Sequence, residues 1–260
     1  MASVLKIENL KYKDILKDVS FSLIDKSFNI LIGSNGSGKT TIVNAIRGLI
    51  KFDGDVSIFD RNIKQGNNFD IYKEVGFFLD EDIILEECAF NELLNILKNL
   101  DYEEEQAKKK IFDKAKKLNI TQLLYKNPKK LFNYEKTLIN FLFSIIHNPK
   151  LLIIDNDLET LDEKNKQKIF SYIKSQKKLT TLFVANNNEY FYNADNFIFL
   201  DEGKIVLECD INELVNNEKK LIKCGSKLPF MIDLSNKLIS YELLNSIKTD
   251  MGELVNEIWK

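Results

Sequence analysis

The chain has 260 residues, of which 44% are hydrophobic and 29% charged, and its formal net charge is -2. This length and composition are ordinary for a globular protein with one large domain and room for a small appendage. The slightly negative charge argues against a binder of duplex nucleic acid, which would carry a basic surface. Met1–Leu10 lacks the apolar stretch of a signal peptide, and the longest apolar runs fall short of the ~20 residues that span a membrane. Any membrane role is therefore expected to depend on a partner.

The first part of the chain is predicted to form short strands and one helix. Segments rich in β-branched and aromatic residues, separated by polar turns, are typical of strands. We place these strands at Val4–Ile7, Val19–Leu23, Phe28–Ile32, Val56–Phe59 and Val75–Leu79. After the third strand, apolar residues recur every three to four positions, which predicts a helix over Thr40–Ile50.

The second part begins with long helices and then returns to strands. From about Glu86 to Asn148 the sequence is rich in Lys and Glu, with Leu and Ile at helical spacing. A helix is expected over Glu163–Ser175, and the tail from about Asp210 is predicted to be a small α-rich unit. The later strands are expected at Leu151–Ile154, Thr181–Val184, Phe197–Leu200 and Lys204–Leu207. The fold class is therefore α/β, with a helical insertion in the core.

The segment between the third strand and the helix matches the phosphate-loop pattern G-x-x-x-x-G-K-[ST] in full. Glycines let the backbone wrap closely around phosphate groups, and N–H groups of the loop and of the helix amino terminus cradle the oxygens. Lys39 is expected to contact the β- and γ-phosphates, and the Thr40 hydroxyl is expected to ligate Mg²⁺. The alternative is a glycine-rich turn that matches the pattern by chance, but the strand before the segment and the helix after it favour a phosphate loop. The predicted ATP-binding residues here are Gly33, Ser34, Asn35, Gly36, Ser37, Gly38, Lys39, Thr40 and Thr41.

A second candidate for the nucleotide site is a carboxylate at the end of a buried strand. Leu151–Ile154 supplies four apolar residues, as a strand covered on both faces requires, and Asp155 follows directly. Four apolar residues and an acid are a weak pattern alone, but they gain weight after a phosphate loop. Asp155 is expected to hold Mg²⁺ through a water molecule.

Several stretches now resemble the ATPases of ATP-binding-cassette (ABC) transporters. Ser34–Thr41 is similar to the Walker A motif of that family, and His147–Leu151 is similar to the segment that leads into its Walker B motif. Leu161-Asp162 resembles the D-loop, and Leu200–Ile205 resembles the strand turn after the switch histidine. The resemblance covers nearly the whole chain. It implies a P-loop NTPase core of the ABC type with an antiparallel β subdomain. The nucleotide-binding domain would cover residues 1–208, with a helical subdomain at about 82–148, and an accessory segment would cover residues 209–260.

Two finer features resemble the energy-coupling-factor (ECF) subgroup of importers. Glu86–Phe90 is similar to an "EEDVAF" stretch of that subgroup, and Lys227–Leu234 with Glu253-Leu254-Val255 is similar to its carboxy-terminal domain. The resemblance implies a transmembrane transporter subunit and a second ABC ATPase subunit as partners, in a homo- or heterodimer, and no nucleic acid. It also implies a cytoplasmic protein, peripheral at the inner face of the cell membrane.

Three positions depart from the catalytic pattern of the family. Its Walker B motif reads D-E-P, whereas this chain reads Asp155-Asn156-Asp157, and an amide cannot accept a proton as the glutamate would. Asn186 stands at the position of the switch histidine. Asp80 stands at the position of the Q-loop glutamine and is a further candidate ligand for Mg²⁺.

The signature motif L-S-G-G-Q has also changed, to Leu131-Phe132-Asn133-Tyr134-Glu135. In the family, its serine hydroxyl and glycine N–H groups close on the γ-phosphate held by the opposite subunit, at a helix amino terminus. Phe132 removes the hydroxyl, and Tyr134 places a ring where the phosphate would approach. No catalytic residue is intact, which predicts that hydrolysis is weak or lost. Relaxed use and selection for binding without turnover both explain this pattern.

Two carboxylates and one aromatic residue each allow two interpretations. Asp157 or Glu159 would replace the general base only if the loop were rearranged; otherwise they are turn residues beside the D-loop. Tyr12 lies where the family stacks an aromatic ring on adenine, but a packing role is the alternative. Lys108–Lys110 is expected to form a solvated helix face.

We expect an ATP-binding subunit of an ABC transporter, most similar to an ECF-type importer, with ATP and Mg²⁺ as cofactors. The alternative is a degenerate cassette that regulates by holding ATP, without transport turnover of its own. A cassette protein of translation or chromosome handling is disfavoured, because such proteins resemble tandem cassettes or carry long coiled coils.

Overall fold

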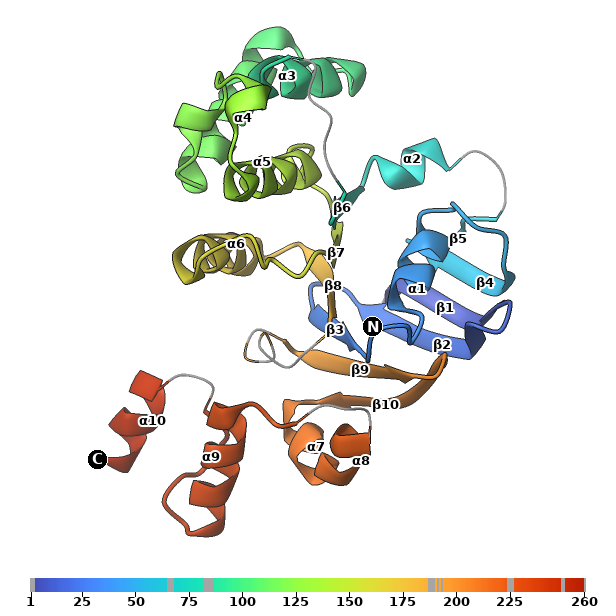
Figure 1. Cartoon of the computed structure of the whole chain (residues 1–260), viewed down its shortest axis with the longest axis vertical. Helices are drawn as coiled ribbons and strands as arrows, with labels where there is room; N and C mark the ends of the chain where they lie inside the picture. The colour runs from blue at the N-terminus through green and yellow to red at the C-terminus, as the bar shows by residue number, and fades with distance from the viewer. Residues whose placement is uncertain are drawn as a thin grey trace. The chain divides into compact units, whose positions relative to one another are not determined.

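A computed structural model describes residues 3–64, 68–81, 87–186, 190, 192, 194–223, 227–248 and 251–259. The chain divides into two compact units (Figure 1). The first unit comprises residues 1–64 and 182–260, and the second comprises residues 65–181. Glu86 of the Glu86–Phe90 stretch lies outside the described residues, as do residues 82–85 and Cys224.

The first unit contains an antiparallel sheet with the strand order β2-β1-β4-β5. Alternate residues of β1 and β2 are buried, because one face of each strand covers the core. Its strands are β1 (Ser3–Tyr12), β2 (Leu16–Ile24), β4 (Asp53–Ile58) and β5 (Arg61–Asn62).

The nucleotide motif of the first unit lies on a second group of strands. β9 (Asn196–Asp201) pairs in parallel with β3 (Phe28–Ile32) and antiparallel with β10 (Lys204–Asp210). Figure 1 shows blue β3 beside orange β9, two segments far apart in the sequence. Every residue of β3 is buried, including the polar Asn29, as expected for a mostly apolar strand covered on both faces. Helix α1 (Lys39–Ile46) follows β3, and it ends four residues earlier than expected because Gly48 adopts a positive φ of 70°.

The tail of the first unit is helical. Helix α7 (Ile211–Asn216) is capped by Asp210, whose carboxylate accepts hydrogen bonds from the N–H groups of Asn212 and Glu213. The helix contacts β9 and β10. The remaining helices are α8 (Glu218–Lys223), α9 (Phe230–Ser240) and α10 (Met251–Ile258).

The second unit combines a parallel strand pair with several helices. β6 (Val75–Leu79) pairs in parallel with β7 (Leu151–Asp155), and Leu79 lies opposite Asp155. Strand β8 (Thr180–Ala185) contains the boundary between the two units. The helices are α2 (Phe69–Tyr72), α3 (Ala89–Asn99), α4 (Glu104–Lys117), α5 (Asn133–Ile145) and α6 (Glu163–Ser175), with short 3₁₀ turns at Thr121–Leu123 and Pro128–Lys130.

The core of the second unit is apolar. Phe141 of α5 packs its ring against Phe78 of β6 at 5.3 Å and against Tyr172 of α6 at 5.8 Å. In the part of the chain that the structure describes, no helix has the length and apolar character needed to cross a membrane.

Candidate functional site

The phosphate loop of the first unit is the turn that joins β3 to α1. Gly36 and Gly38 adopt positive φ values of 81° and 110°, a region that other L-residues rarely adopt. A Cβ atom at Gly33 would lie 2.3 Å from the carbonyl oxygen of Leu200 in β9. A Cβ atom at Gly38 would lie 2.6 Å from Leu16 Cδ2. The loop therefore has a tight path that these glycines permit.

Lys39 lies inside the loop at the first position of α1. Its side chain is buried, and its Nζ donates hydrogen bonds to the carbonyl oxygens of Gly33 at 2.7 Å and Ser34 at 2.8 Å. These bonds hold the ammonium group against the loop backbone. A positive charge at the amino terminus of a helix, surrounded by loop N–H groups, favours an anion there.

Ser37 gives the clearest sign of a ligand at this loop. Its residue is 4% exposed, and its Oγ has no hydrogen-bond partner among the described residues. A buried hydroxyl without a partner costs ~1–3 kcal/mol, so such groups are uncommon away from functional sites. By contrast, Ser34, Asn35, Gly36 and Thr40 are exposed, which leaves the rim of the loop accessible. The loop thus has the backbone path and the unsatisfied polar group that a phosphate ligand would use.

Tyr12 lies in the same unit, at the end of β1. It is half-buried, and its carbonyl oxygen accepts a hydrogen bond from Ile15 N–H at 3.0 Å. The turn that this bond closes leads to Ile15 and Leu16, the two residues that surround Gly38. The ring of Tyr12 also has Lys13 Nζ 5.1 Å from its centroid. The turn after Tyr12 therefore reaches the phosphate loop, a contact that the sequence did not reveal.

Asp155 and Asp80 lie together in the second unit. The parallel pairing of β6 and β7 brings the carboxyl ends of both strands to one edge, where Asp80 N–H donates to Asp155 O at 2.9 Å. Asp155 is half-buried and Asp80 is exposed. Asp80 and Asp155, the two acidic residues predicted to act at Mg²⁺, are thus adjacent along the backbone at this edge.

Asn156 follows Asp155 and is buried, with 7% of its surface exposed. Its Nδ2 donates to the carbonyl oxygen of Leu79 at 3.3 Å, and its Oδ1 accepts from Leu158 N–H at 2.9 Å. Both ends of the amide are therefore used to connect the turn after β7 to the end of β6. The Asn156 amide itself is too weak a base to accept a proton from water, as a general base must.

The carboxylates of Asp157 and Glu159 are exposed. Asp157 Oδ1 accepts a hydrogen bond from Glu159 N–H at 3.3 Å, as in an Asx turn. This geometry favours the interpretation of both as turn residues. Asn186, after β8 in the first unit, is exposed.

The segment Leu131–Glu135 forms the amino terminus of α5. Phe132 and Tyr134 are 64% and 41% exposed, and their rings stack at 6.0 Å with an angle of 7° between planes. Lys126 Nζ lies 4.9 Å from the centroid of the Phe132 ring. Two aromatic rings and an ammonium group therefore occupy the surface at this helix end.

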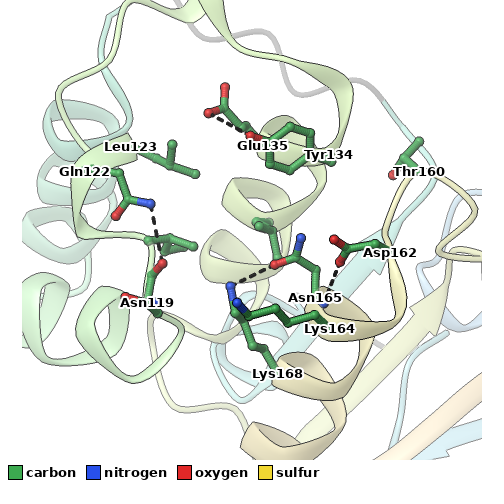
Figure 2. A pocket seen from close by; sticks show the side chains of 12 residues that line it. Asn119, Gln122, Leu123, Tyr134, Glu135, Thr160, Asp162, Lys164, Asn165 and Lys168 are labelled. Atoms are coloured by element: carbon green, nitrogen blue, oxygen red, sulfur yellow. Dashed lines mark hydrogen bonds between the residues drawn. The ribbon is translucent and has the colours of Figure 1, made fainter.

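Glu135 is a structural residue that sequence analysis missed. It is buried, and its Oε2 accepts from Phe132 N–H at 3.0 Å and from Lys126 Nζ at 2.5 Å. Burial opposes its ionisation, but these two bonds outweigh burial and lower the pKa of Glu135. A glutamate at the third helical position is the sequence signal for such a cap. Figure 2 shows Tyr134 and Glu135 on the wall of a pocket of about 390 Å³, which Asp162 and Lys168 also line.

The profile of the ABC transporter family matches residues 16–159 of this chain. That stretch includes the phosphate loop and the turn after β7. The chain belongs to the ABC transporter family.

Curated members of the ABC transporter family align over most of the chain. The energy-coupling factor transporter ATP-binding protein EcfA2 of Caldanaerobacter subterraneus subsp. tengcongensis is 30% identical over 86% of this chain and 82% of its own length. The protein named EcfA1 of Oenococcus oeni is 26% identical over 99% of this chain and 98% of its own.

Solved ABC structures share the fold. That of cbiO1 from Clostridium perfringens, part of the ABC transporter complex cbiONQ, has a TM-score of 0.74 at 19% identity and covers 93% of this chain and 99% of its own. An ATP-binding subunit of an ABC transporter has a TM-score of 0.75 at 18% identity and covers 99% of this chain and all of its own. The fold is therefore the α/β fold of a P-loop NTPase cassette, as the resemblance to the ABC family implied.

Two departures from the ABC pattern now have a structural description. At the position of the Walker B glutamate, Asn156 is a buried amide with both ends hydrogen-bonded. At the position of the signature serine, Phe132 presents an exposed ring stacked on Tyr134. Asn156 is thus held by hydrogen bonds within the second unit, and the Phe132 ring is stacked on Tyr134.

Proposed function

We propose that this chain is the ATP-binding subunit of an ECF-type ABC transporter and that it binds MgATP at the loop of residues 33–40. The observation that carries the proposal is the phosphate loop itself, in which the buried Ser37 hydroxyl has no partner among the described residues. The names of the curated relatives support the ECF subgroup, since both are energy-coupling factor transporter ATP-binding proteins.

The residues of the loop fit the phosphate groups of ATP. The N–H groups of the turn and of the start of α1 would donate to phosphate oxygens, and Lys39 would add a positive charge beside them. Thr40 would supply a hydroxyl to Mg²⁺, whose charge would neutralise the phosphates. We assign Asp155, and Asp80 beside it, as the acidic residues for the same ion. Oxygen ligands of this kind are those that Mg²⁺ prefers.

Hydrolysis of ATP is proposed to be weak or absent in this chain. Asn156 cannot take a proton from water at any working pH, and its amide is already engaged with Leu79 and Leu158. Phe132 presents a ring where the family has a hydroxyl. The chain would then contribute ATP binding to an assembly with a second ABC ATPase subunit and a transmembrane subunit, at the cytoplasmic face of the membrane.

The adenine site is tested by Tyr12→Ala. We expect the affinity for MgATP to fall by ~1 kcal/mol, because stacking of an aromatic ring on a base is worth ~1–3 kcal/mol. Affinities for ATP and for a triphosphate without a flat base are compared by competition with a fluorescent ATP analogue. Tyr12→Phe, which retains the ring, should keep the preference for ATP. An unchanged preference in Tyr12→Ala would remove Tyr12 from the site.

The transporter assignment is tested by purification of the tagged chain from membranes of its own source. We expect it to copurify with a polytopic membrane protein and with a second ABC ATPase. The docking surface is expected near residues 82–100, of which residues 82–86 lie outside the described part. The companion variant reverses the charges of the half-buried Glu92 and the exposed Lys98 of α3, as Glu92→Lys/Lys98→Glu. Quantitative recovery as a free monomer beside its expressed neighbours would contradict the proposal.

A regulatory module is the second candidate, in which the cassette holds ATP without its own turnover. The Asn156 amide, hydrogen-bonded through both its Nδ2 and its Oδ1, and the ring stack at Phe132 favour it, since both are compatible with binding and would not supply the usual chemistry. Copurification of an intact second ATPase that works equally well without this chain would favour the regulatory module.

A further inference from the structure

The second unit carries a pocket with two chambers, outside the regions discussed so far. One chamber, of about 300 Å³, lies along α4 and is lined by lysines of that helix. The other, of about 440 Å³, is lined by apolar groups of Ile145, Pro149 and Leu179. Lys114, Asn148, Tyr172 and Gln176 line both chambers and make them continuous.

The charges that line this pocket are strongly unbalanced. Asp113 is the single carboxylate among the residues that line either chamber. Lys150 pairs with Glu74, and Lys110 donates to Tyr102 Oη at 2.8 Å. The other five form no ion pair with a carboxylate among the described residues. The lysines of the pocket are Lys109, Lys110, Lys114, Lys117, Lys150, Lys177 and Lys178.

Lys114 is the most constrained of these lysines. It is 7% exposed, and its Nζ donates to Tyr172 Oη at 2.7 Å. Burial, with Lys110 and Lys117 nearby, lowers the pKa of Lys114 to about 7. A buried ammonium group is costly unless a negative charge or several acceptors compensate it. An anion in the pocket would provide that compensation.

We propose that this pocket binds a small phosphomonoester, with the dianionic phosphate among the lysines of α4 and the organic group in the apolar chamber. Lysine is a common ligand of phosphate, which it contacts as a point charge. The α4 chamber is lined by four lysines and one carboxylate, so its net positive charge matches a dianion. The apolar walls of the second chamber match a flat or aliphatic group of modest size.

Binding of phenyl phosphate by the full chain tests the proposal. Isothermal titration calorimetry should show one site whose affinity falls about tenfold or more in Lys109→Ala/Lys117→Ala, which removes two exposed lysines of α4 that line the phosphate chamber, because each 1.4 kcal/mol of lost charge-assisted contact is tenfold. The matched control is Lys129→Ala/Lys130→Ala, which also removes two exposed lysines of this unit and should bind as wild type does. Equal affinity of all three proteins, or no binding at all, would overturn the proposal.

Two further arms separate this site from other phosphate sites and sources. The titration is repeated with excess MgADP; a loss of the phenyl phosphate signal would place the site at the phosphate loop and overturn the proposal. Phosphatidylcholine vesicles with and without phosphatidic acid are then compared by sedimentation. Binding to phosphatidic acid vesicles that Lys109→Ala/Lys117→Ala abolishes identifies a lipid as one source, whereas phenyl phosphate binding alone identifies a free phosphomonoester.

Proton uptake gives a readout that a merely structural role of Lys114 would not change. The groups that face its ammonium are Lys110, Asp113 and Lys117 of α4, Tyr172 of α6, and His147 after α5. Near pH 8 the phosphate is already a dianion, so its arrival should draw a proton onto Lys114. Titrations in buffers of different ionisation enthalpy should show this uptake in wild type. Lys114→Met, with its folding checked by thermal unfolding, should bind phenyl phosphate without proton uptake. Proton uptake equal to that of wild type would overturn the role of Lys114.

Discussion

Lys39→Ala is expected to weaken MgATP binding by the isolated chain by at least about tenfold. Charge-assisted hydrogen bonds are worth ~1.5–3 kcal/mol, so the loss of this ammonium should weaken binding about tenfold to more than a hundredfold. The buried position of Lys39 against Gly33 and Ser34 places the charge inside the loop, where solvent screens it little. Titration with a fluorescent ATP analogue measures the change.

Two controls make the result specific to the phosphate loop. Lys51→Ala removes an exposed lysine just after α1 and should leave the affinity unchanged. Thermal unfolding of Lys39→Ala shows whether the two lost hydrogen bonds to the loop carbonyls have destabilised the fold. A folded Lys39→Ala protein that binds as tightly as wild type would refute the assignment of this loop.

Steady-state phosphate release by wild type is expected to be little faster than that of Lys39→Ala. Loss of a positioned general base alone removes a factor of ~10²–10⁴ in rate. The losses proposed at Asn156, Asn186 and Phe132 would all affect the same transition state, so their effects should not simply multiply. The release is measured for the chain alone and at concentrations that favour a homodimer.

Asn156→Glu is the informative companion variant. A carboxylate cannot donate to Leu79 O as the amide does, so it would lie beside an acceptor in a buried position. We expect a loss of ~1–3 kcal/mol in stability from the unsatisfied group. We expect hydrolysis to rise, if at all, only in Asn156→Glu/Asn186→His. Wild-type turnover at ~1 s⁻¹ or faster, abolished by Asp157→Asn or Glu159→Gln, would instead show a relocated base.

Local sequence was sufficient to locate most of the strands and the phosphate loop, although β5 was not predicted and β1 and β2 extend beyond the predicted segments. The run Phe28–Ile32 is apolar at almost every position, and the structure buries all of it in β3. The loop pattern depends on consecutive residues, because glycine spacing and a following helix together determine a phosphate-binding turn. The end of α1 was predicted less well, since Ile42–Leu49 keeps helical spacing beyond the point where Gly48 ends the helix.

Contacts between distant residues could not be predicted from spacing. Glycine at position 33 is required because β9 places the Leu200 carbonyl oxygen against it, 167 positions along the chain. Asp80 and Asp155 become neighbours only through the pairing of β6 with β7. The partners of Asn156 and Glu135 likewise depend on how separate segments pack. A residue that departs from the family pattern can therefore be recognised from the sequence, whereas the contacts that the residue makes in the structure cannot.

The sequence by itself determined the family, the fold class and the position of the phosphate loop, because each depends on residue type and short-range spacing. The tertiary structure alone decided which polar groups are buried. Lys114 looks like any lysine on a charged helix, yet contact of α4 with Tyr172 buries it and lowers its pKa. Ser37 looks like one of two serines in a loop, yet only its hydroxyl is buried without a partner among the described residues. Burial depends on neighbouring residues from other parts of the chain, which cannot be identified from residue spacing along the chain.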